Sequence, residues 1–307
     1  MQTSDIKRRI RSVKSTQQIT RAMKFVAAAK LRRAQEAMLA MRPYAERVDS
    51  ILRHLANDLY GDEHPLFRDA GPEKCVATIV IAGDRGLCGG FNANILRTAR
   101  EHVRSKADAE HFFFTVGKRA TAGFRKAALG RDRLVKSYSD VFDKLSFALA
   151  TEICDLCVAR MDRRAAQPFD AVYLVYNEFV SAMAQKPVVK RILPFDLAAV
   201  RRECALEPTP SSGGAAPGAF RRPSYEIEPD AETTLERLMT RRIAVDVHRG
   251  ALESYAAELS ARMTAMDSAT GNAEDMIGNL TLLYNRARQS GITSELIDIV
   301  GGANAQA

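Results

Sequence analysis

The sequence lacks long apolar runs and is sparing with cysteine. Nothing in its 307 residues approaches the 18 or more apolar residues that a membrane-spanning helix requires. The longest strongly apolar stretches, such as residues 75–83, have the length of a strand. Its five cysteines are odd in number and scattered, unlike a secreted disulfide framework. These absences predict a soluble protein of a reducing compartment, which reaches a membrane only through partners.

Patterns typical of catalysis and of metal binding are also missing. The histidines show no ligand spacing, and no pair of carboxylates is arranged for acid–base chemistry. Cys154 and Cys157 form a C-x-x-C, but no second Cys or His pair completes a zinc site, so we interpret them as one buried helical face. No cofactor is expected, and a mechanical or scaffolding role is favoured over an enzyme.

One glycine-rich turn stands where a phosphate could bind, after the apolar stretch at residues 75–83. It spans residues 83–90 and contains Asp84, Arg85, Gly86, Cys88 and Gly89. The turn fits neither G-x-G-x-x-G nor the P-loop, whose Lys and Ser or Thr it lacks. We interpret it as a tight backbone turn with a small buried or interfacial thiol. A nucleotide-binding α/β enzyme with helical arms remains an alternative that rests on this turn alone.

Acidic residues are scarce in the first 57 positions, which hold thirteen Lys or Arg against four Asp or Glu. This segment carries a local net charge of +9, whereas the whole chain carries +8. Such a basic helix suggests nucleic acid, an anionic membrane surface or an acidic protein as its partner. The plain alternative is a solvated helix face.

Both ends of the chain carry an apolar seam with a 3.5-residue period, from Ile6 to Leu59 and from Leu235 to Ala287. A period sustained over this many heptads winds helices around each other. Two ordinary amphipathic helices on a globular core are the alternative. The seams are interrupted at Gln17, Thr20, Lys24, Arg242, Arg249 and Thr270.

Between the seams, short β-branched runs alternate with helical stretches, which predicts a small, mostly parallel sheet with helices on its faces. We expect a first coiled-coil helix over 1–60 with a kink at Pro43, an α/β domain over 74–200, and a last helix over 230–302. A flexible Pro/Gly/Ser-rich insertion is expected over 203–224. Within the domain, strands are expected at 75–83, 111–117, 170–179 and 187–195, and helices at 93–106, 118–127 and 144–164.

The two terminal helices differ in length. If they pair antiparallel from their bases, the residue numbers of two facing positions add up to about 290. Residues 286–302 then extend beyond the end of the first helix. The same sum places the polar residues Gln17, Thr20 and Lys24 opposite Thr270, Gly271 and Ala273. Because apolar residues in the overhang have no cover within the chain, they predict another protein around this tip. These residues are Ile292, Leu296, Ile297, Ile299 and Val300.

Three segments carry a resemblance to a known family. They are residues 15–28 (STQQITRAMKFVAA), 84–92 (DRGLCGGFN) and 284–296 (YNRARQSGITSEL). In order and in approximate spacing they resemble the gamma subunit of F-type rotary ATP synthases of the bacterial type. The resemblance implies a long antiparallel coiled coil of the terminal helices and a central Rossmann-like α/β domain.

It further implies a non-catalytic rotor shaft that couples ion translocation to ATP synthesis or hydrolysis and regulates it. The implied partners are the alpha and beta subunits of the catalytic hexamer, the epsilon subunit and the c-subunit ring, on the cytoplasmic face of the bacterial inner membrane. By match to the family motifs, Met23 would face the acidic lever loop of beta. Four residues would meet the catch loops and bearing of the head: Arg262, Gln289, Thr293 and Glu295.

Photosynthetic members of the family have a redox-active cysteine pair at about the position of the 203–224 insertion. Here the insertion has only Cys204, which predicts no thiol regulation. The alternative of a different class is a basic coiled-coil protein that binds nucleic acid, with affinity that falls steeply as salt rises.

Overall fold

The computed structural model describes residues 3–59, 66, 71–126, 134–161, 168–195 and 226–304, so the expected insertion lies outside the described residues. The chain divides into two compact units. Unit 1 contains Met1–Leu31, Leu87–Gly89 and Leu259–Ala307. Unit 2 contains Arg32–Gly86 and Gly90–Glu258. Each of the two long terminal helices contributes to both units.

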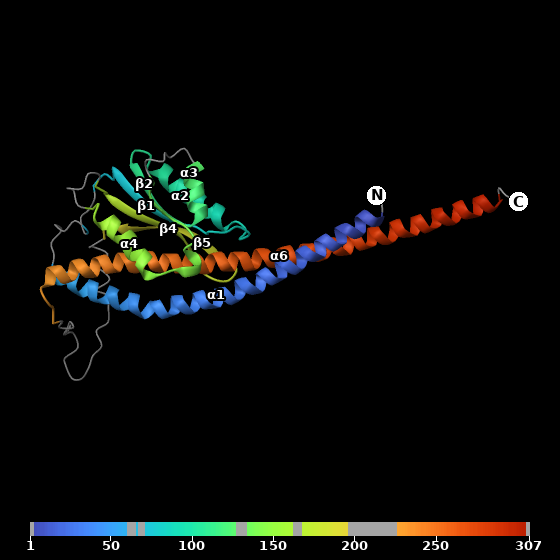
Figure 1. Cartoon of the computed structure of the whole chain (residues 1–307). Coiled ribbons are helices and arrows are strands. Elements are labelled where there is room, and N and C mark those ends of the chain that lie inside the picture. Colours follow the sequence, from blue (N-terminus) through green and yellow to red (C-terminus); the bar gives the residue numbers. More distant parts are fainter. Residues whose placement is uncertain are drawn as a thin grey trace, which may run out of the picture. The chain divides into compact units, whose positions relative to one another are not determined.

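The terminal helices are α1 (Thr3–Leu59) and α6 (Ala231–Asn304), which confirms the two long helices expected from the heptads. The side chain of Asp230 caps α6, since its Oδ1 accepts a hydrogen bond from the Thr233 amide at 2.8 Å. Pro43 lies inside α1, but the helix remains unbroken there. The segment of α1 in unit 2 curves gently rather than ending at the proline (Figure 1).

Unit 2 is built on a five-stranded sheet with the order β3-β2-β1-β4-β5. Every neighbouring pair is parallel except β4 and β5, which confirms a mostly parallel sheet. The edge strand β3 was not predicted from the sequence. The strands are β1 (Cys75–Ile81), β2 (Glu110–Val116), β3 (Leu134–Tyr138), β4 (Ala171–Phe179) and β5 (Gln185–Leu193).

Helices cover both faces of this sheet. Figure 1 shows α2 (Phe91–Ser105) and α3 (Lys118–Lys126) on one face, and α4 (Phe147–Val158) with α6 on the other. The helix expected from residue 144 is shorter than predicted. Residues Phe142–Lys144 form a 3-10 turn (η2), and α4 begins after Ser146, whose backbone is extended.

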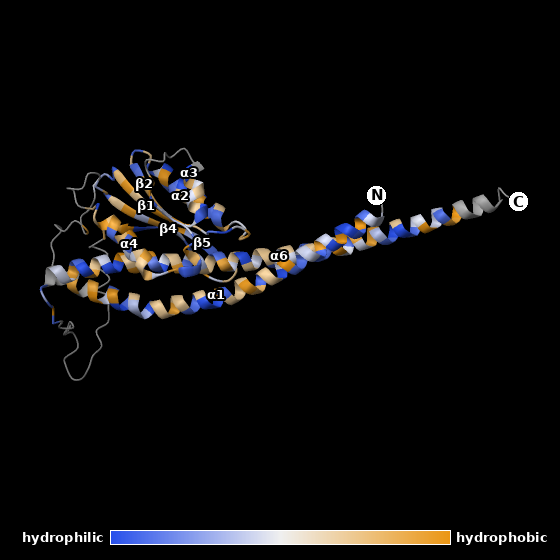
Figure 2. Ribbon diagram, in the orientation of Figure 1, coloured by the Kyte–Doolittle hydropathy of each residue, from blue (hydrophilic) through white to orange (hydrophobic). Residues whose placement is uncertain are grey.

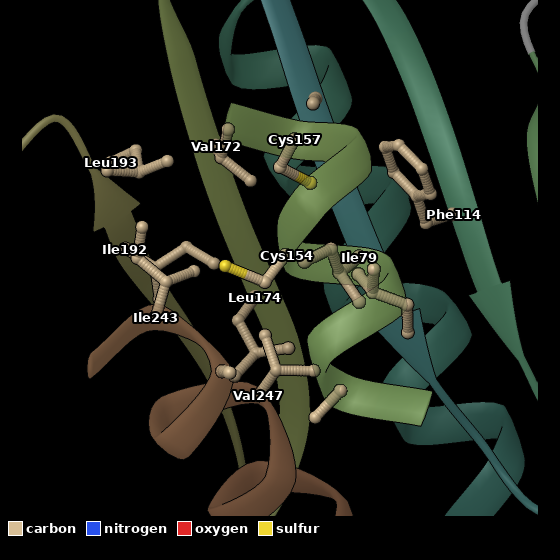
Figure 3. Packing of buried hydrophobic residues seen from close by; sticks show 14 of the residues in the cluster. Ile79, Phe114, Cys154, Cys157, Val172, Leu174, Ile192, Leu193, Ile243 and Val247 are labelled. Atoms are coloured by element: carbon tan, nitrogen blue, oxygen red, sulfur yellow. The ribbon is translucent and has the colours of Figure 1, made fainter. Parts of the chain in front are cut away.

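The main hydrophobic core lies between the sheet and the face covered by α4 and α6. Figure 3 shows Ile79 and Leu174 from the sheet near Ile243 and Val247 from α6. Strand residues that point to the opposite face, such as Val80, are also fully buried. Burial on both faces is what a parallel sheet with helices on each side requires.

Cys154 and Cys157 are buried in this core, as predicted. Their sulfur atoms point in different directions (Figure 3), and both cysteines are free thiols. Burial raises the pKa of Cys154 to about 12 and also raises the pKa of Cys157. The Cys154 thiol donates a hydrogen bond to the Thr240 carbonyl at 3.1 Å. The C-x-x-C is therefore part of the packed core.

Two arginines that interrupt the second seam are held by acidic residues. The Nε of Arg242 lies 3.2 Å from the Asp246 carboxylate, and Arg242 also pairs with Asp49 of α1. The Nε of Arg249 lies 2.8 Å from Glu253. Because each arginine has a carboxylate partner, the seam of unit 2 accommodates charge where apolar residues would ordinarily pack.

Candidate functional site

The seam of unit 1 is antiparallel and in the predicted register. The Thr20 and Thr270 hydroxyl oxygens are 2.8 Å apart, and Lys24 Nζ lies 2.6 Å from Asp267 Oδ1. Partner numbers therefore sum to 290 or 291, which confirms the expected sum of about 290. In Figure 1, α6 continues beyond the first residues of α1.

The polar layer around Thr20 is real but smaller than predicted. Thr20 is buried and so is Ala273, whereas Gly271 faces solvent. Lys24 pairs with Asp267 rather than with the residues expected opposite it. The difference arises because a long lysine side chain leaves the seam and reaches a carboxylate at its edge.

The residues carried over from the family motifs lie on unit 1 in two environments. Met23 and Arg262 are half-buried, and Arg262 takes part in an interaction within the chain. Gln289, Thr293 and Glu295 are exposed near the end of α6. The Thr293 hydroxyl donates a hydrogen bond to the Gln289 carbonyl at 2.9 Å, within the helix. The three exposed residues thus form a solvent-facing polar set.

The expected apolar tip is present at three of its five residues: Ile292 is 47% exposed, Leu296 56% and Ile297 66%. The side chains of Ile299 and Val300 lie outside the described part of the chain. Figure 2 shows apolar and polar residues intermixed along this end of α6. The exposed apolar surface begins earlier than predicted, because Met276, Leu282 and Leu283 are also exposed.

A second exposed apolar set lies on α1 and was not identified from the heptads. Ile19, Phe25 and Val26 are each between 57% and 61% exposed. They lie outside the seam positions, and large apolar residues away from the seam were the signal available in the sequence. Exposed apolar groups on both helices are typical of a surface that another protein covers.

The basic character predicted for the first helix is on its surface. Lys7, Arg8, Arg9, Arg11 and Lys14 are all exposed, whereas Ile6 beside them is 1% exposed. Arg8 lies 3.5 Å from Asp5, a contact between exposed side chains. Most of this positive charge is therefore available to a partner.

Asp84 of the glycine-rich turn links three backbone amides of unit 2. The Asp84 carboxylate accepts hydrogen bonds from the amides of Lys118, Asp140 and Phe142 at 3.0, 2.9 and 3.4 Å. Lys118 is the first residue of α3, so a carboxylate of the chain occupies the position where a helix terminus would bind a phosphate. Arg85 lies 3.4 Å from the Asp143 carboxylate and is exposed. Gly86 is half-buried.

The tip of the same turn, Leu87–Gly89, belongs to unit 1. Cys88 is 2% exposed, as predicted for a buried thiol. Gly89 has a φ of +56°, and a Cβ at this position would lie 3.9 Å from the Ala265 side chain. The tip therefore packs against α6, as a tight backbone turn would.

Neither a cluster of metal ligands nor a membrane-spanning helix occurs within the described residues. No three His, Cys, Asp or Glu side chains there are grouped as a metal site would require. Within the same residues, no helix combines the length and apolar character of a membrane crossing.

Comparison with known proteins gives a single family. The family model described as ATP synthase matches residues 2–306. The ATP synthase gamma chain of Pelotomaculum thermopropionicum is 44% identical over 301 residues and covers 98% of both chains. The ATP synthase gamma chain of Salinibacter ruber is 44% identical over 308 residues, with 98% of this chain and 97% of the relative covered.

Solved structures share the fold. A chain of the Euglena gracilis mitochondrial ATP synthase (OSCP, F1 and c-ring, rotational state 3) matches with a TM-score of 0.69 and 20% identity, over 99% of this chain and 94% of that one. A chain of the Tetrahymena thermophila mitochondrial ATP synthase central stalk and c-ring matches with a TM-score of 0.60 and 24% identity, over 82% and 99%. None of these comparisons supports the nucleic-acid-binding alternative.

Proposed function

We propose that this chain, which belongs to the family of ATP synthase gamma chains, is the rotor shaft that couples ion translocation to nucleotide chemistry in the catalytic head. One observation carries the proposal beyond family membership. The long coiled coil of unit 1 ends in exposed apolar and basic side chains instead of a closed core. A shaft that turns inside a bearing needs such a surface, because these side chains contact another protein and not the shaft's own core.

The proposed head contacts are the five family-motif residues of unit 1: Met23, Arg262, Gln289, Thr293 and Glu295. The exposure of the last three supports a bearing contact near the end of α6. The partial exposure of Met23 between exposed Arg21 and Phe25 supports contact with a loop of beta.

The exposed basic surface of α1 gives the shaft an electrostatic complement to acidic loops on beta. Charge of this kind mainly steers association and orients the partner, since exposed pairs contribute little affinity each. Steering without tight pairing suits a shaft whose partner changes as it turns.

The α/β domain is proposed to meet the epsilon subunit and the c ring, so that the chain is membrane-associated only through its complex. The location is then the cytoplasmic face of the bacterial inner membrane. Catalysis belongs to the beta subunits, and the chain itself is non-catalytic. The organisation proposed is a first shaft helix over 1–60, a domain over 74–200, an insertion over 203–224 and a second shaft helix over 230–302.

The direct test is co-expression with alpha and beta subunits of a bacterial ATP synthase, followed by size-exclusion chromatography and an ATPase assay. We expect a stoichiometric complex whose ATPase activity exceeds that of the alpha and beta subunits alone. Failure of the chain to co-elute with the hexamer would overturn the proposal.

Two variants test the parts of the surface separately. Truncation after Ala287 should leave helix content in proportion to length but reduce coupling, because the exposed end of α6 is removed.

Reversing the charge of Lys7, Arg8, Arg9 and Arg11 should slow assembly with the head, most of all at low salt. Unchanged assembly and coupling in the second variant would remove the electrostatic part of the proposal.

A further inference from the structure

Helices α2 and α3, which cover one face of the sheet of unit 2, carry positive charge that none of the contacts proposed above uses (Figure 1). Together they contain seven Lys or Arg residues and a single acidic residue, Glu101. Their formal net charge is therefore +6, whereas the whole chain carries +8. Because so much of the excess is concentrated on two short helices, they form a second basic surface besides that of α1.

The arginines of these helices lie on the side that faces away from the sheet. Arg97 and Arg104 are two turns apart on α2, and both are exposed. Arg119 is exposed on α3. The opposite side of α2 is buried through Phe91, Ile95, Ala99 and Val103. We name the surface formed by Arg97, Arg100, Arg104 and Arg119 the arginine face.

The two helices are in contact along this face. A Cβ at Gly123 would lie 2.6 Å from Cδ2 of Leu96, so α3 approaches α2 as closely as a glycine allows. Arg100 connects the helices, since its Nη2 donates a hydrogen bond to the Gly123 carbonyl at 3.3 Å. The arginines of α2 and α3 therefore belong to one continuous surface.

The chain's own carboxylates neutralise little of the arginine face. Arg97 Nε lies 4.0 Å from Glu101, and both side chains are more than 60% exposed. Arg104 and Arg119 make no ion pair with a described residue. Because an exposed pair such as Arg97–Glu101 contributes little, the face keeps most of its positive potential for a partner.

The chemistry of the face favours an acidic protein over other anionic partners. None of the large exposed hydrophobic residues of the described chain lies on α2 or α3, whereas a helix that lies in a membrane surface inserts such residues among the lipids. Phe91 and Phe124 are buried, so neither ring can stack on the bases of a nucleic acid. Guanidinium groups bind carboxylates through paired hydrogen bonds.

We propose that the arginine face is a docking surface for an acidic segment of a partner protein, with Asp or Glu side chains at helical spacing. Arg97 and Arg104 are separated by roughly 10 Å along the axis of α2. An acidic helix that lies alongside presents carboxylates at i, i+3 or i+4, and i+7 with the same rise. The proposal concerns unit 2 alone and does not depend on the proposed rotor function.

The test uses a peptide of ten glutamates with a benzophenone at one end, a matched peptide of ten glutamines, and the full chain. Crosslinked residues are mapped by mass spectrometry after irradiation, which separates binding at α2 and α3 from binding at the basic surface of α1. We expect saturable crosslinks on α2 and α3 that are at least about tenfold stronger with the glutamate peptide. They should weaken as salt is added.

Charge reversal at the arginine face should remove these crosslinks selectively. The triple variant Arg97→Glu, Arg104→Glu and Arg119→Glu should reduce crosslinking on α2 and α3 by about tenfold or more. Crosslinks on α1 should remain, and they serve as an internal reference within the same sample.

A matched control changes the net charge by the same amount at other exposed positions of unit 2. It consists of Lys144→Glu, Lys186→Glu and Arg237→Glu. This control should leave crosslinking on α2 and α3 within about twofold of the wild type, because only long-range charge has changed.

If the triple reversal does not fold, the changes Arg97→Gln, Arg104→Gln and Arg119→Gln should still weaken crosslinking severalfold. Equal losses in the arginine-face variant and in the control would overturn the proposal, since net charge alone would then explain binding. A DNA duplex or phosphatidylglycerol vesicles could also compete for α2 and α3. If either displaced the labelled peptide at a lower concentration of charge than unlabelled glutamate peptide does, phosphate would be the preferred partner and the proposal would fail.

Discussion

The two units bury their apolar side chains in different ways. In unit 2, strand residues such as Val80 and Phe114 are fully buried, and helices cover both faces of the sheet. In unit 1, burial follows a narrow seam through residues such as Ala27, Met266 and Ala273. Large apolar residues beside that seam, including Phe25, stay exposed. Unit 2 thus buries its apolar side chains within its own fold, whereas much of the apolar surface of unit 1 stays exposed and is available to a partner.

Ion pairs also differ in burial between the two units. Asp246 and Arg242 of unit 2 are 7% and 18% exposed and pair with each other, while Lys190 also pairs with Asp246 and Asp49 with Arg242. Removing one member of this partly buried network leaves the charge of the others less well compensated. Lys24 and Asp267 of unit 1 are 36% and 60% exposed. Water or a partner protein can replace an exposed ion pair such as Lys24–Asp267 at a small cost in free energy.

The largest expected effect comes from the same substitution made in both units. Phe114→Ala should lower the free energy of unfolding by about 3–5 kcal/mol, since it empties a fully buried position. Phe25→Ala should change it by less than about 0.5 kcal/mol, because that ring is 61% exposed. Urea unfolding followed by circular dichroism measures both.

The Phe25 variant also has an expected effect in the complex. If the head covers this ring, Phe25→Ala should weaken coupling while leaving the isolated chain as stable as before. A loss of stability in Phe25→Ala similar to that in Phe114→Ala would contradict the contrast between the units.

Glycine to alanine changes should have opposite signs in the two units. Gly117 has a φ of +96°, and a Cβ there would lie 1.8 Å from the Ala82 carbonyl oxygen, so Gly117→Ala should cost about 2–3 kcal/mol. Gly278 has nothing within 4 Å of its added Cβ, so Gly278→Ala should stabilise α6 by about 0.5–1 kcal/mol. Thermal unfolding of both variants checks the signs, and equal signs would refute the packing argument.

Acid should destabilise unit 2 through His102. Burial, aided by nearby Lys106, lowers the pKa of His102 to about 4, and its ring packs 4.4 Å from the Tyr173 ring. The unfolded chain protonates this histidine near pH 6.5, whereas the folded chain does so only near pH 4. Its contribution is therefore complete above about pH 6.5 and is lost as the pH falls toward 4.

The measurement is the difference between wild type and His102→Phe in urea unfolding from pH 7 to pH 4. Allowing for solvent screening at a partly exposed ring, we expect about 1–2 kcal/mol of the wild-type loss to be absent in the variant. Parallel pH profiles for the two proteins would show that other groups carry the acid sensitivity.

The fold was predictable where periodicity reports burial directly. The heptads predicted both long helices and a register sum near 290, which the Thr20–Thr270 contact confirms. The edge strand β3 was missed because its residues, LVKSY, are only partly buried and lack an apolar run. Its position depends on parallel pairing with β2, which is a tertiary property.

The candidate site was predictable in part. The apolar tip followed from the unequal helix lengths, but Ile19, Phe25 and Val26 lie off the seam, and no periodicity rule marks an exposed apolar side chain as functional. The role of Asp84 was also out of reach, because its three amide partners lie 34 to 58 residues away in sequence. Contacts over such separations are set by the folded sheet.

The smallest expected effect concerns the ion pair at the edge of the unit 1 seam. Lys24 Nζ is 2.6 Å from Asp267 Oδ1, yet both side chains are substantially exposed. A double-mutant cycle of Lys24→Gln and Asp267→Asn should give a coupling energy below about 1 kcal/mol, decreasing as salt is added. Short distance alone does not make a pair strong, since water and ions screen it. A coupling energy well above this value would mean that the edge of the seam is shielded from solvent. The contrast with the buried ion pairs of unit 2 would then fail for charged side chains, even if it held for apolar ones.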